Sequence, residues 1–203
     1  LKEAQAYDAS RLNDNIEHAV NESHGKVITC DGELIEAWFH SNSGGVTTKA
    51  STGLNYRGEE NYTKSTASPE TADNSENFEW STTLSKSEVL QALREMGVSV
   101  STISEFGIGE KDESGRAVTL KIGNTEFSAS TFRLKVGSTK MKSTLINNVV
   151  VSKYSINISG KGYGHGVGMS QWGAKILAEQ GKSAEEIINF YFDNIEIVNA
   201  KYD

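Results

Sequence analysis

The chain has 203 residues, of which 36% are hydrophobic and 23% are charged, and its formal net charge is −7 at pH 7. That length suffices for one domain or two small ones, and the composition is typical of a folded protein rather than a disordered one. The acidic balance argues against a nucleic-acid backbone as the partner. The sequence contains no run of 18 apolar residues, so no membrane-spanning helix is predicted.

The first predicted element is a helix. Ile16 and Val20 fall on one helical face, Asn13 or Asp14 can cap its start, and Gly25 follows as a stop signal. We therefore expect a short amphipathic helix that ends before the first strand.

Two strands are predicted next, over residues 26–30 and 33–40. Asp31-Gly32 stands between them, and Asp-Gly between strand-like runs is a strong hairpin signal. Cys30 closes the first strand and is the chain's single cysteine. An internal disulfide is therefore excluded, and a small core residue is favoured over a reactive thiol.

The middle of the chain begins with loops and a helix. A small-residue turn over residues 41–48 precedes a polar, turn-rich loop region over 50–77. A capping box at residues 85–88 then predicts the start of a helix, which Gly97 ends.

The second half combines strands and helices. Residues 102–158 are predicted as a strand-rich subregion with a hairpin turn at Gly123-Asn124. Two helices finish the chain, one over about 170–180 and one that a second capping box opens at residues 183–186. The pattern predicts an α+β fold in a single domain over residues 1–203, with central antiparallel strands and hairpins and with helices at both ends.

Glycine occupies every second position from Gly160 to Gly168, and this run leads directly into residues 169–172. In an extended segment these glycines would share one face, so we expect another group to lie against that bare backbone. A flexible linker is the plain alternative, but such linkers are Gly/Ser mixtures, and this run holds Tyr163, His165 and Val167. Neither the dinucleotide nor the phosphate-loop spacing is present. The run therefore predicts a glycine-lined turn into a helix N-terminus, where backbone N–H groups suit a polar substrate or a developing negative charge.

The candidate chemical groups are histidines, one serine and the acidic residues. The histidines are His18, His24, His40 and His165. None shows the tight pair spacing of zinc sites, so no metal site is predicted. His165 is favoured as a site residue because its glycine neighbours give it little reason to pack in a core.

A nucleophilic Ser43 with His165 stays open as an alternative, although Asn42 replaces the glycine that a nucleophile elbow requires. Spacing selects no pair of carboxylates for glycoside chemistry; the candidates by position are Glu33, Glu36, Glu59 and Glu60.

The run Gly-Tyr-Gly-His-Gly-Val-Gly-Met-Ser-Gln-Trp-Gly-Ala at residues 162–174 resembles the signature of the stage II sporulation protein D family and its amidase-enhancer relatives. The helix-to-strand entry at 19–28 and Phe-His-Ser-Asn-Ser-Gly-Gly-Val-Thr at 39–47 resemble further segments of that family. A third resemblance lies at 132–144, in Phe132-Arg133, Gly137 and Lys142-Ser143-Thr144. The resemblance spans about residues 16–197.

This resemblance implies a peptidoglycan lytic transglycosylase. Such enzymes cleave MurNAc–GlcNAc glycan strands without water to 1,6-anhydro products, as in engulfment during sporulation. One glutamate acts first as an acid and then as a base. The family pattern places that glutamate before Leu1, so we expect an N-terminally truncated, inactive fragment whose catalytic residue is unknown. The zinc ligands of some relatives would also precede Leu1, so no cofactor is expected in this chain.

The resemblance further implies that the matching segments wall a glycine-lined substrate cleft, with His165 as an auxiliary catalytic residue. The implied substrate-binding residues are Ser41, Ser43, Gly44, Gly45, Tyr163, Gly164 and Gln171. The implied partners are peptidoglycan glycan strands and other cell-wall hydrolases of the engulfment machinery, not nucleic acid. The full-length protein would be membrane-anchored, extracytoplasmic and directed toward the cell wall. A non-catalytic module that presents peptidoglycan to an amidase is the alternative.

Overall fold

The computed structural model describes residues 10, 12–58 and 61–200. They form two compact units, one with the described residues up to Ile35 and from Glu196 onward, and one from Glu36 to Ile195. The single domain predicted over residues 1–203 stays a prediction, and each unit is described by itself. Helices and antiparallel sheets both occur, which confirms the α+β class. Within the described residues, no helix has the length and apolar character needed to cross a membrane.

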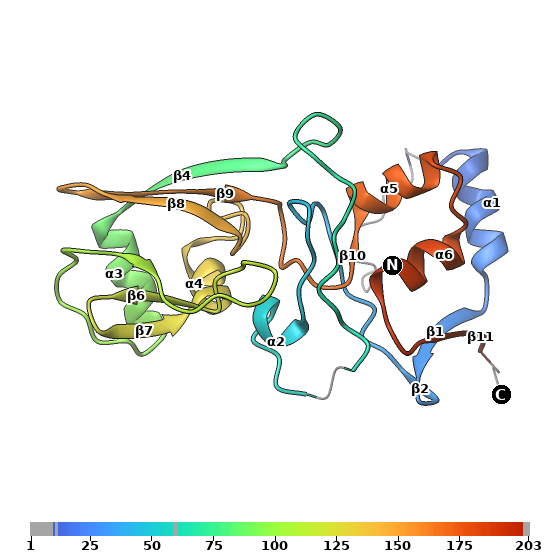
Figure 1. Ribbon diagram of the computed structural model, residues 1–203, viewed down its shortest axis with the longest axis horizontal. Coiled ribbons are helices and arrows are strands. Elements are labelled where there is room, and N and C mark those ends of the chain that lie inside the picture. Colours follow the sequence, from blue (N-terminus) through green and yellow to red (C-terminus); the bar gives the residue numbers. More distant parts are fainter. Residues whose placement is uncertain (1–9, 11, 59–60, 201–203) are drawn as a thin grey trace. The chain divides into compact units, whose positions relative to one another are not determined.

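The first unit combines one helix with a three-stranded antiparallel sheet of order β11-β1-β2. Its elements are α1 (Asp14–Ser23), β1 (Lys26–Cys30), β2 (Glu33–Leu34) and β11 (Glu196–Asn199) (Figure 1). The predicted cap is confirmed, because the Asn13 side chain accepts a hydrogen bond from the Ile16 N–H. The predicted hairpin is confirmed. Its two-residue loop is formed by Asp31 and Gly32, whose φ values of 53° and 82° suit such a loop. The second strand ends earlier than predicted, at Leu34, and the sequence does not predict the short β11.

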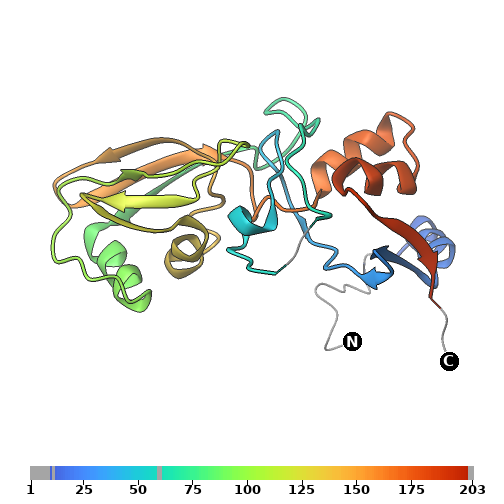
Figure 2. The ribbon, with the colours of Figure 1, turned by 60° about the horizontal axis from the view of Figure 1, so that its bottom comes forward.

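The second unit contains two three-stranded antiparallel sheets. The main sheet has the order β4 (Glu79–Ser85), β9 (Ser155–Lys161), β8 (Ile146–Val151); the smaller one has the order β5 (Gly107–Ile108), β6 (Thr119–Ile122), β7 (Thr125–Ser128). In Figures 1 and 2 the smaller sheet and the helices α3 (Lys86–Glu95) and α4 (Ala129–Val136) lie on one side of the main sheet. Trp80, Leu84 and Ile156 of the main sheet pack there with Leu93 and Phe132 in the hydrophobic core.

Local signals predict α3 but not α4. The Ser85 side chain accepts a hydrogen bond from the Glu88 N–H, and the Glu88 side chain reaches back to the Ser85 N–H, as the capping box predicts. Helix α4 corrects the prediction of strands throughout 102–158. It begins directly after β7, and its cap is a single contact in which the Ser128 side chain accepts from the Thr131 N–H.

The remaining elements of this unit are β3 (Phe39–His40), α2 (Ala50–Gly53), β10 (Met169–Ser170), α5 (Gln171–Glu179) and α6 (Ala184–Tyr191). Strand β3 pairs in parallel with β10, so that Phe39 lies opposite Met169 and His40 opposite Ser170. Both closing helices are confirmed, with Ser170 as the cap of α5 and the second capping box at the start of α6. The end of the glycine run is thereby fixed to a strand on one side and to a helix on the other.

Candidate functional site

The Ser-Gly-Gly turn and the glycine run lie side by side. The Asn42 N–H donates to the Tyr163 carbonyl at 3.0 Å, and the Tyr163 N–H donates to the Asn42 carbonyl at 2.7 Å. Farther along, the Thr48 N–H donates to the Gly166 carbonyl at 2.9 Å. Segments 39–48 and 160–173, which the sequence predicts to form one site, are therefore in direct backbone contact.

The glycine run is not one extended strand. Strand β9 ends at Lys161. The φ values of the four glycines that follow are positive, a conformation that residues with a side chain rarely adopt: 80° at Gly162, 131° at Gly164, 83° at Gly166 and 67° at Gly168. The prediction of one bare face open to a sugar polymer is therefore wrong, because the chain's own atoms lie against these glycines.

The close approaches to three of these glycines come from two parts of the chain, the segment 39–48 and Arg116. A Cβ at Gly162 would lie 2.8 Å from the Asn42 carbonyl oxygen, and one at Gly164 would lie 2.5 Å from the His40 Cβ. A Cβ at Gly166 would collide with the guanidinium of Arg116. The glycines are thus required by internal packing.

A buried carboxylate connects the two motifs. Glu70 is 1% exposed, and its Oε1 accepts hydrogen bonds from the Ser43 N–H at 2.8 Å, the Ser43 hydroxyl at 2.5 Å and the Ser170 hydroxyl at 2.6 Å. Its Oε2 accepts from the Ser68 hydroxyl at 2.5 Å. Burial raises the pKa of Glu70, but the hydrogen bonds from Ser170, Ser43 and Ser68 outweigh burial and hold the pKa below its ordinary value. Glu70 is therefore ionised near neutral pH and cannot serve as a proton donor there. No local signal in the loop over 50–77 singles it out.

The same contacts bear on the serine-nucleophile alternative. Ser43 is fully buried, and its hydroxyl donates to a carboxylate. His165 uses its Nδ1 to accept from the Val167 N–H at 3.1 Å. Among the described interactions no hydrogen bond joins Ser43 to His165, so the structure offers this serine no histidine base.

Two arginines support the site from the interior. Arg116 is fully buried, and its Nη2 donates to the Ser43 carbonyl at 2.5 Å and to the Val46 carbonyl at 3.1 Å. Burial lowers the pKa of Arg116 to about 10, which leaves it protonated at neutral pH. Arg133 is 7% exposed, and its Nε donates to the Lys142 carbonyl at 3.0 Å. The Gly164 N–H donates to that same carbonyl at 2.9 Å, so the 132–144 segment is also fixed to the glycine run.

Two neutral histidines lie between these segments. The rings of His40 and His165 have centroids 5.5 Å apart, and the His40 Nδ1 donates to the Val167 carbonyl at 3.1 Å. Burial, with His165 and Arg116 nearby, holds the pKa of His40 well below its ordinary value. Burial and Arg133 lower the pKa of His165 to about 4, against the opposing effect of a hydrogen bond with the Phe39 backbone. Neither imidazole carries a charge at neutral pH.

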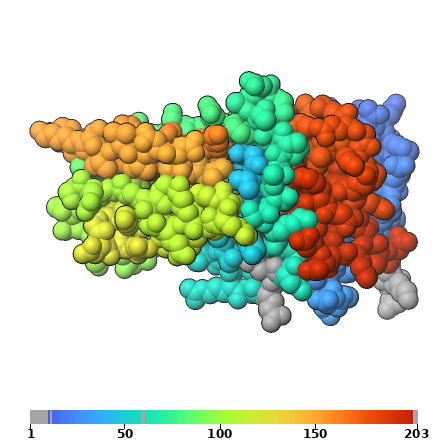
Figure 3. All heavy atoms as spheres, in the orientation of Figure 1, coloured from blue at the N-terminus to red at the C-terminus, as the bar shows by residue number. Residues whose placement is uncertain are grey.

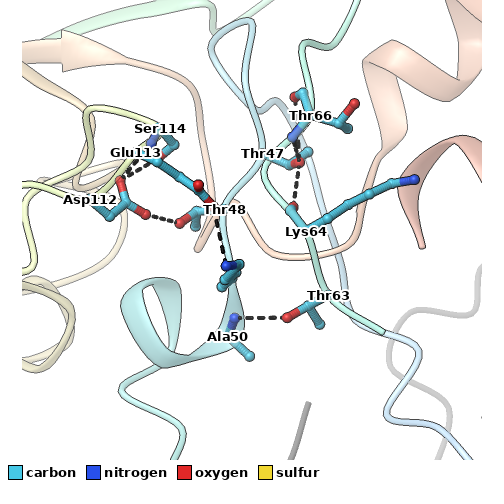
Figure 4. A network of polar contacts seen from close by, with 10 residues as sticks. Thr47, Thr48, Ala50, Thr63, Lys64, Thr66, Asp112, Glu113 and Ser114 are labelled. Atoms are coloured by element: carbon cyan, nitrogen blue, oxygen red, sulfur yellow. Dashed lines mark hydrogen bonds and ion pairs between the residues drawn. The ribbon is translucent and has the colours of Figure 1, made fainter. Parts of the chain in front are cut away.

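Hydrogen bonds and one ion pair fix the chain after the Ser-Gly-Gly turn on both sides (Figure 4). The Thr48 hydroxyl donates to Asp112, and the Thr47 hydroxyl donates to the Lys64 carbonyl at 3.0 Å. The Thr66 N–H donates to the Thr47 hydroxyl at 3.0 Å. An ion pair of 3.4 Å joins Lys49 to Glu113. The chain after the turn is therefore attached to Lys64 and Thr66 on one side and to Asp112 and Glu113 on the other.

We name the group formed by the half-buried Tyr163, His165 and Lys142, together with the buried Arg133, the Tyr163 patch. Tyr163 and His165 are half-buried, and the Lys142 Nζ lies 5.1 Å from the centroid of the Tyr163 ring. Arg133 is close enough to lower the pKa of His165. An aromatic ring, a neutral imidazole and two cations thus gather where three sequence segments meet.

The other predicted site residues take different places. Ser43 and Gly44 are buried, Ser41, Gly45 and Gly164 are half-buried, and Gln171 is exposed. The Trp172 N–H donates to the Ser41 carbonyl at 3.1 Å, so Ser41 and Gln171 lie at one junction. Sequence reasoning missed Glu70 and Arg116, and it quoted Arg133 and Lys142 without a role. In the described part of the chain, no cluster of three or more His, Cys, Asp or Glu residues is placed to hold a metal ion.

The chain belongs to the family described as "Domain of unknown function (DUF8618)", which matches residues 40–168. That range includes the Ser-Gly-Gly turn and every residue of the Tyr163 patch.

Similar curated proteins extend the comparison. The chain is 30% identical over 200 residues to stage II sporulation protein D of Bacillus amyloliquefaciens, an alignment that covers 98% of the chain and 56% of that protein. It is 29% identical to the amidase enhancer of Bacillus subtilis, with 93% of the chain and 33% of that protein covered. An uncharacterized protein of Brachyspira hyodysenteriae is 30% identical, with 96% and 52% covered. The predicted resemblance to stage II sporulation protein D is confirmed, and the chain spans about half the length of these relatives or less.

Proposed function

We propose that this chain is the glycan-holding part of a peptidoglycan lytic transglycosylase. The observation that carries the proposal is the Tyr163 patch. A half-buried tyrosine offers a face on which a sugar ring can pack, and Lys142, with the buried Arg133 nearby, offers positive charge to the carboxyl groups of peptidoglycan. The names of the Bacillus relatives support a role at the cell wall.

The proposed reaction needs one group that gives a proton to the glycosidic oxygen and then removes one from the muramic acid hydroxyl. Glu70 is unsuited, because it is buried and its pKa is lowered. We place the catalytic glutamate before Leu1, and we assign to the neutral His165 an auxiliary role in orienting the sugar. The surface that holds the glycan is then formed by side chains rather than by the bare glycines.

The proposal extends to the setting of the full-length protein. It would act outside the cytoplasm, anchored to the membrane and directed toward the cell wall, together with other hydrolases of the engulfment machinery. Ser41 and Gln171, at the start of α5, would contact hydroxyl or acetamido groups next to the Tyr163 patch.

A second candidate is a non-catalytic module that presents peptidoglycan to an amidase. The similarity to an amidase enhancer over 93% of the chain favours it. This candidate uses the same patch but requires no acid.

Digestion of purified peptidoglycan by the full-length protein, followed by mass spectrometry of the products, separates these functions. Anhydro-muropeptides support the transglycosylase, whereas binding without release supports the presenting module. New reducing ends would indicate hydrolysis and overturn both. His165→Ala is expected to reduce release at least tenfold with an unchanged fold, while the exposed His18→Ala serves as the control. Equal turnover of the two variants would show that His165 has no role in glycan cleavage.

A further inference from the structure

The main sheet presents one face away from the hydrophobic core. Because side chains alternate along a strand, Ser81 and Thr83 point opposite to the buried Trp80 and Leu84. The register places Ser81 opposite Ser159 and Thr83 opposite Asn157 on β9, and Asn148 of β8 lies opposite Ser159. We name Ser81, Thr83, Asn148, Asn157 and Ser159 the hydroxyl–amide face.

This face is hollowed. A cavity of about 350 Å³ is lined by the five residues of the hydroxyl–amide face, together with neighbouring strand atoms. Figure 3 shows the atoms of β8 and β9 (orange) uncovered along one border of the unit. The hollow is lined by none of the residues of the Tyr163 patch. Neither the Ser-Gly-Gly turn nor the glycine run predicts this hollow.

The chemistry of the hollow is uncharged and polar. Three hydroxyls and two carboxamides supply both donors and acceptors, and the Thr83 hydroxyl donates to the Asn157 Oδ1 at 2.5 Å. Val150, which is 48% exposed, lies opposite Asn157 and provides an apolar surface on the same side of the sheet. Sugars present the matching groups: hydroxyl and acetamido groups around the ring edge, and C–H groups and methyls for the valine. A charged partner would gain little from this lining.

The hollow and the Tyr163 patch are close to each other along the chain, because β9 lines the hollow and ends at Lys161, two residues before Tyr163. Four residues of chain lead from Ser159 to Tyr163, so their Cα atoms lie at most about 14 Å apart, and less because Gly162, just after β9 ends at Lys161, has a φ of 80°. A glycan strand of several sugars can therefore reach from the Tyr163 patch to the hollow.

We propose that the hydroxyl–amide face is a second subsite that binds hydroxyl and acetamido groups of further sugars of the glycan strand held at the Tyr163 patch. This inference rests on the proposed function and deepens it, because it makes the protein selective for long glycans. The patch holds the charged muramic unit, and the hollow holds sugars farther along the same strand.

The test compares glycan fragments of two and eight sugars, prepared from purified peptidoglycan, as ligands of the full-length protein in calorimetry. Asn148→Ala/Asn157→Ala is expected to weaken binding of the eight-sugar fragment by about tenfold, the order expected for two lost hydrogen bonds. Binding of the two-sugar fragment stays unchanged. The control is Gln91→Ala, an exposed uncharged residue of α3 on the other side of the sheet, and it changes neither affinity.

The outcomes separate the two proposals. Equal affinity of the double variant and the unchanged protein for the eight-sugar fragment overturns the second subsite and leaves the proposed function standing. Failure of the unchanged protein to bind either fragment overturns the proposed function and the subsite together. If the double variant folds poorly, amide chemical shifts of the unchanged protein decide: the eight-sugar fragment should move Ser81 and Ser159, and shifts confined to the Tyr163 patch overturn the subsite.

Discussion

Ser43 and Glu70 are 27 residues apart in the chain and are joined twice, because both the backbone N–H and the hydroxyl of Ser43 donate to the same carboxylate oxygen. The Ser170 hydroxyl donates to that oxygen as well, at 2.6 Å. One carboxylate thus connects the Ser-Gly-Gly turn with the cap of α5. Hydrogen bonds to a buried charge are stronger than neutral ones, so this contact fixes the spacing of the two motifs.

Replacing Glu70 by Ala should lower the free energy of unfolding by about 3 kcal/mol, because several buried donors lose their acceptor at once. Urea unfolding measures the change. Glu179→Ala, at an exposed position of α5, is the control and should stay within about 0.5 kcal/mol. A loss below about 1 kcal/mol for Glu70→Ala would show that the carboxylate does not hold the motifs together.

The same carboxylate should make stability depend on pH in the acid range. The pKa of Glu70 is lowered in the folded state from an ordinary value of 4.5, so the folded protein binds this proton less readily than the unfolded chain. The stabilisation is complete above that ordinary value and is lost as pH falls through the folded pKa. The difference in unfolding free energy between the unchanged protein and Glu70→Gln should therefore shrink from pH 7 to pH 3. A difference that stays constant would contradict the assignment.

The sequence predicts those parts of the fold that depend on neighbouring residues. The capping boxes at Ser85 and Ser183 and the turn at Asp31-Gly32 are local, and all three are confirmed. Helix α4 escapes prediction because Ser128 caps it without an acidic partner three residues on, directly after a strand.

The interior of the site depends on distant residues. Arg116 contacts the carbonyl of Ser43, 73 positions away, and no local pattern marks either Arg116 or Glu70. The sequence identifies the glycine run as unusual, but it cannot show that Arg116 and His40 are the groups that lie against it. Motif matching found the segments that meet at the Tyr163 patch, whereas the contacts that hold them came from the structure.

Two glycines with similar backbone conformations allow the cost of backbone strain to be measured apart from the cost of a steric clash. Gly166 and Gly97 have φ values of 83° and 75°, but a Cβ at Gly166 would collide with Arg116, whereas a Cβ at Gly97 would meet nothing within 4 Å. Gly97→Ala should cost about 1 kcal/mol from the backbone alone. Gly166→Ala should cost about 3 kcal/mol or more, because overpacking adds to the same backbone cost. Equal losses in thermal unfolding would mean that the Arg116 contact is unimportant.

His165 should remain neutral well into the acid range. Its pKa is lowered to about 4, mainly by burial, whereas the ordinary value is 6.5. As pH falls from 6.5 toward 4, the unfolded chain binds a proton that the folded protein does not, so stability should fall by roughly 2–3 kcal/mol. His165→Asn should reduce this slope, and the exposed His18→Asn should leave it intact. An imidazole NMR titration of His165 with a midpoint near 6.5 would refute the neutral state.

Charge in the Tyr163 patch should govern binding of the acidic sugar. Lys142 lies over the Tyr163 ring and donates to the Asn77 Oδ1 at 2.8 Å, so its ammonium is held beside the ring. Lys142→Gln keeps a hydrogen-bond donor but removes the charge, and it should weaken binding of a muramic acid disaccharide about three- to tenfold at low salt. The difference should narrow at 1 M salt, where charges a few ångströms apart are screened. Lys121→Gln, an exposed lysine of β6, controls for net charge. If both variants lose affinity equally, the effect belongs to the overall charge of the protein and not to the patch. If neither variant loses affinity, the sugar does not bind next to Lys142.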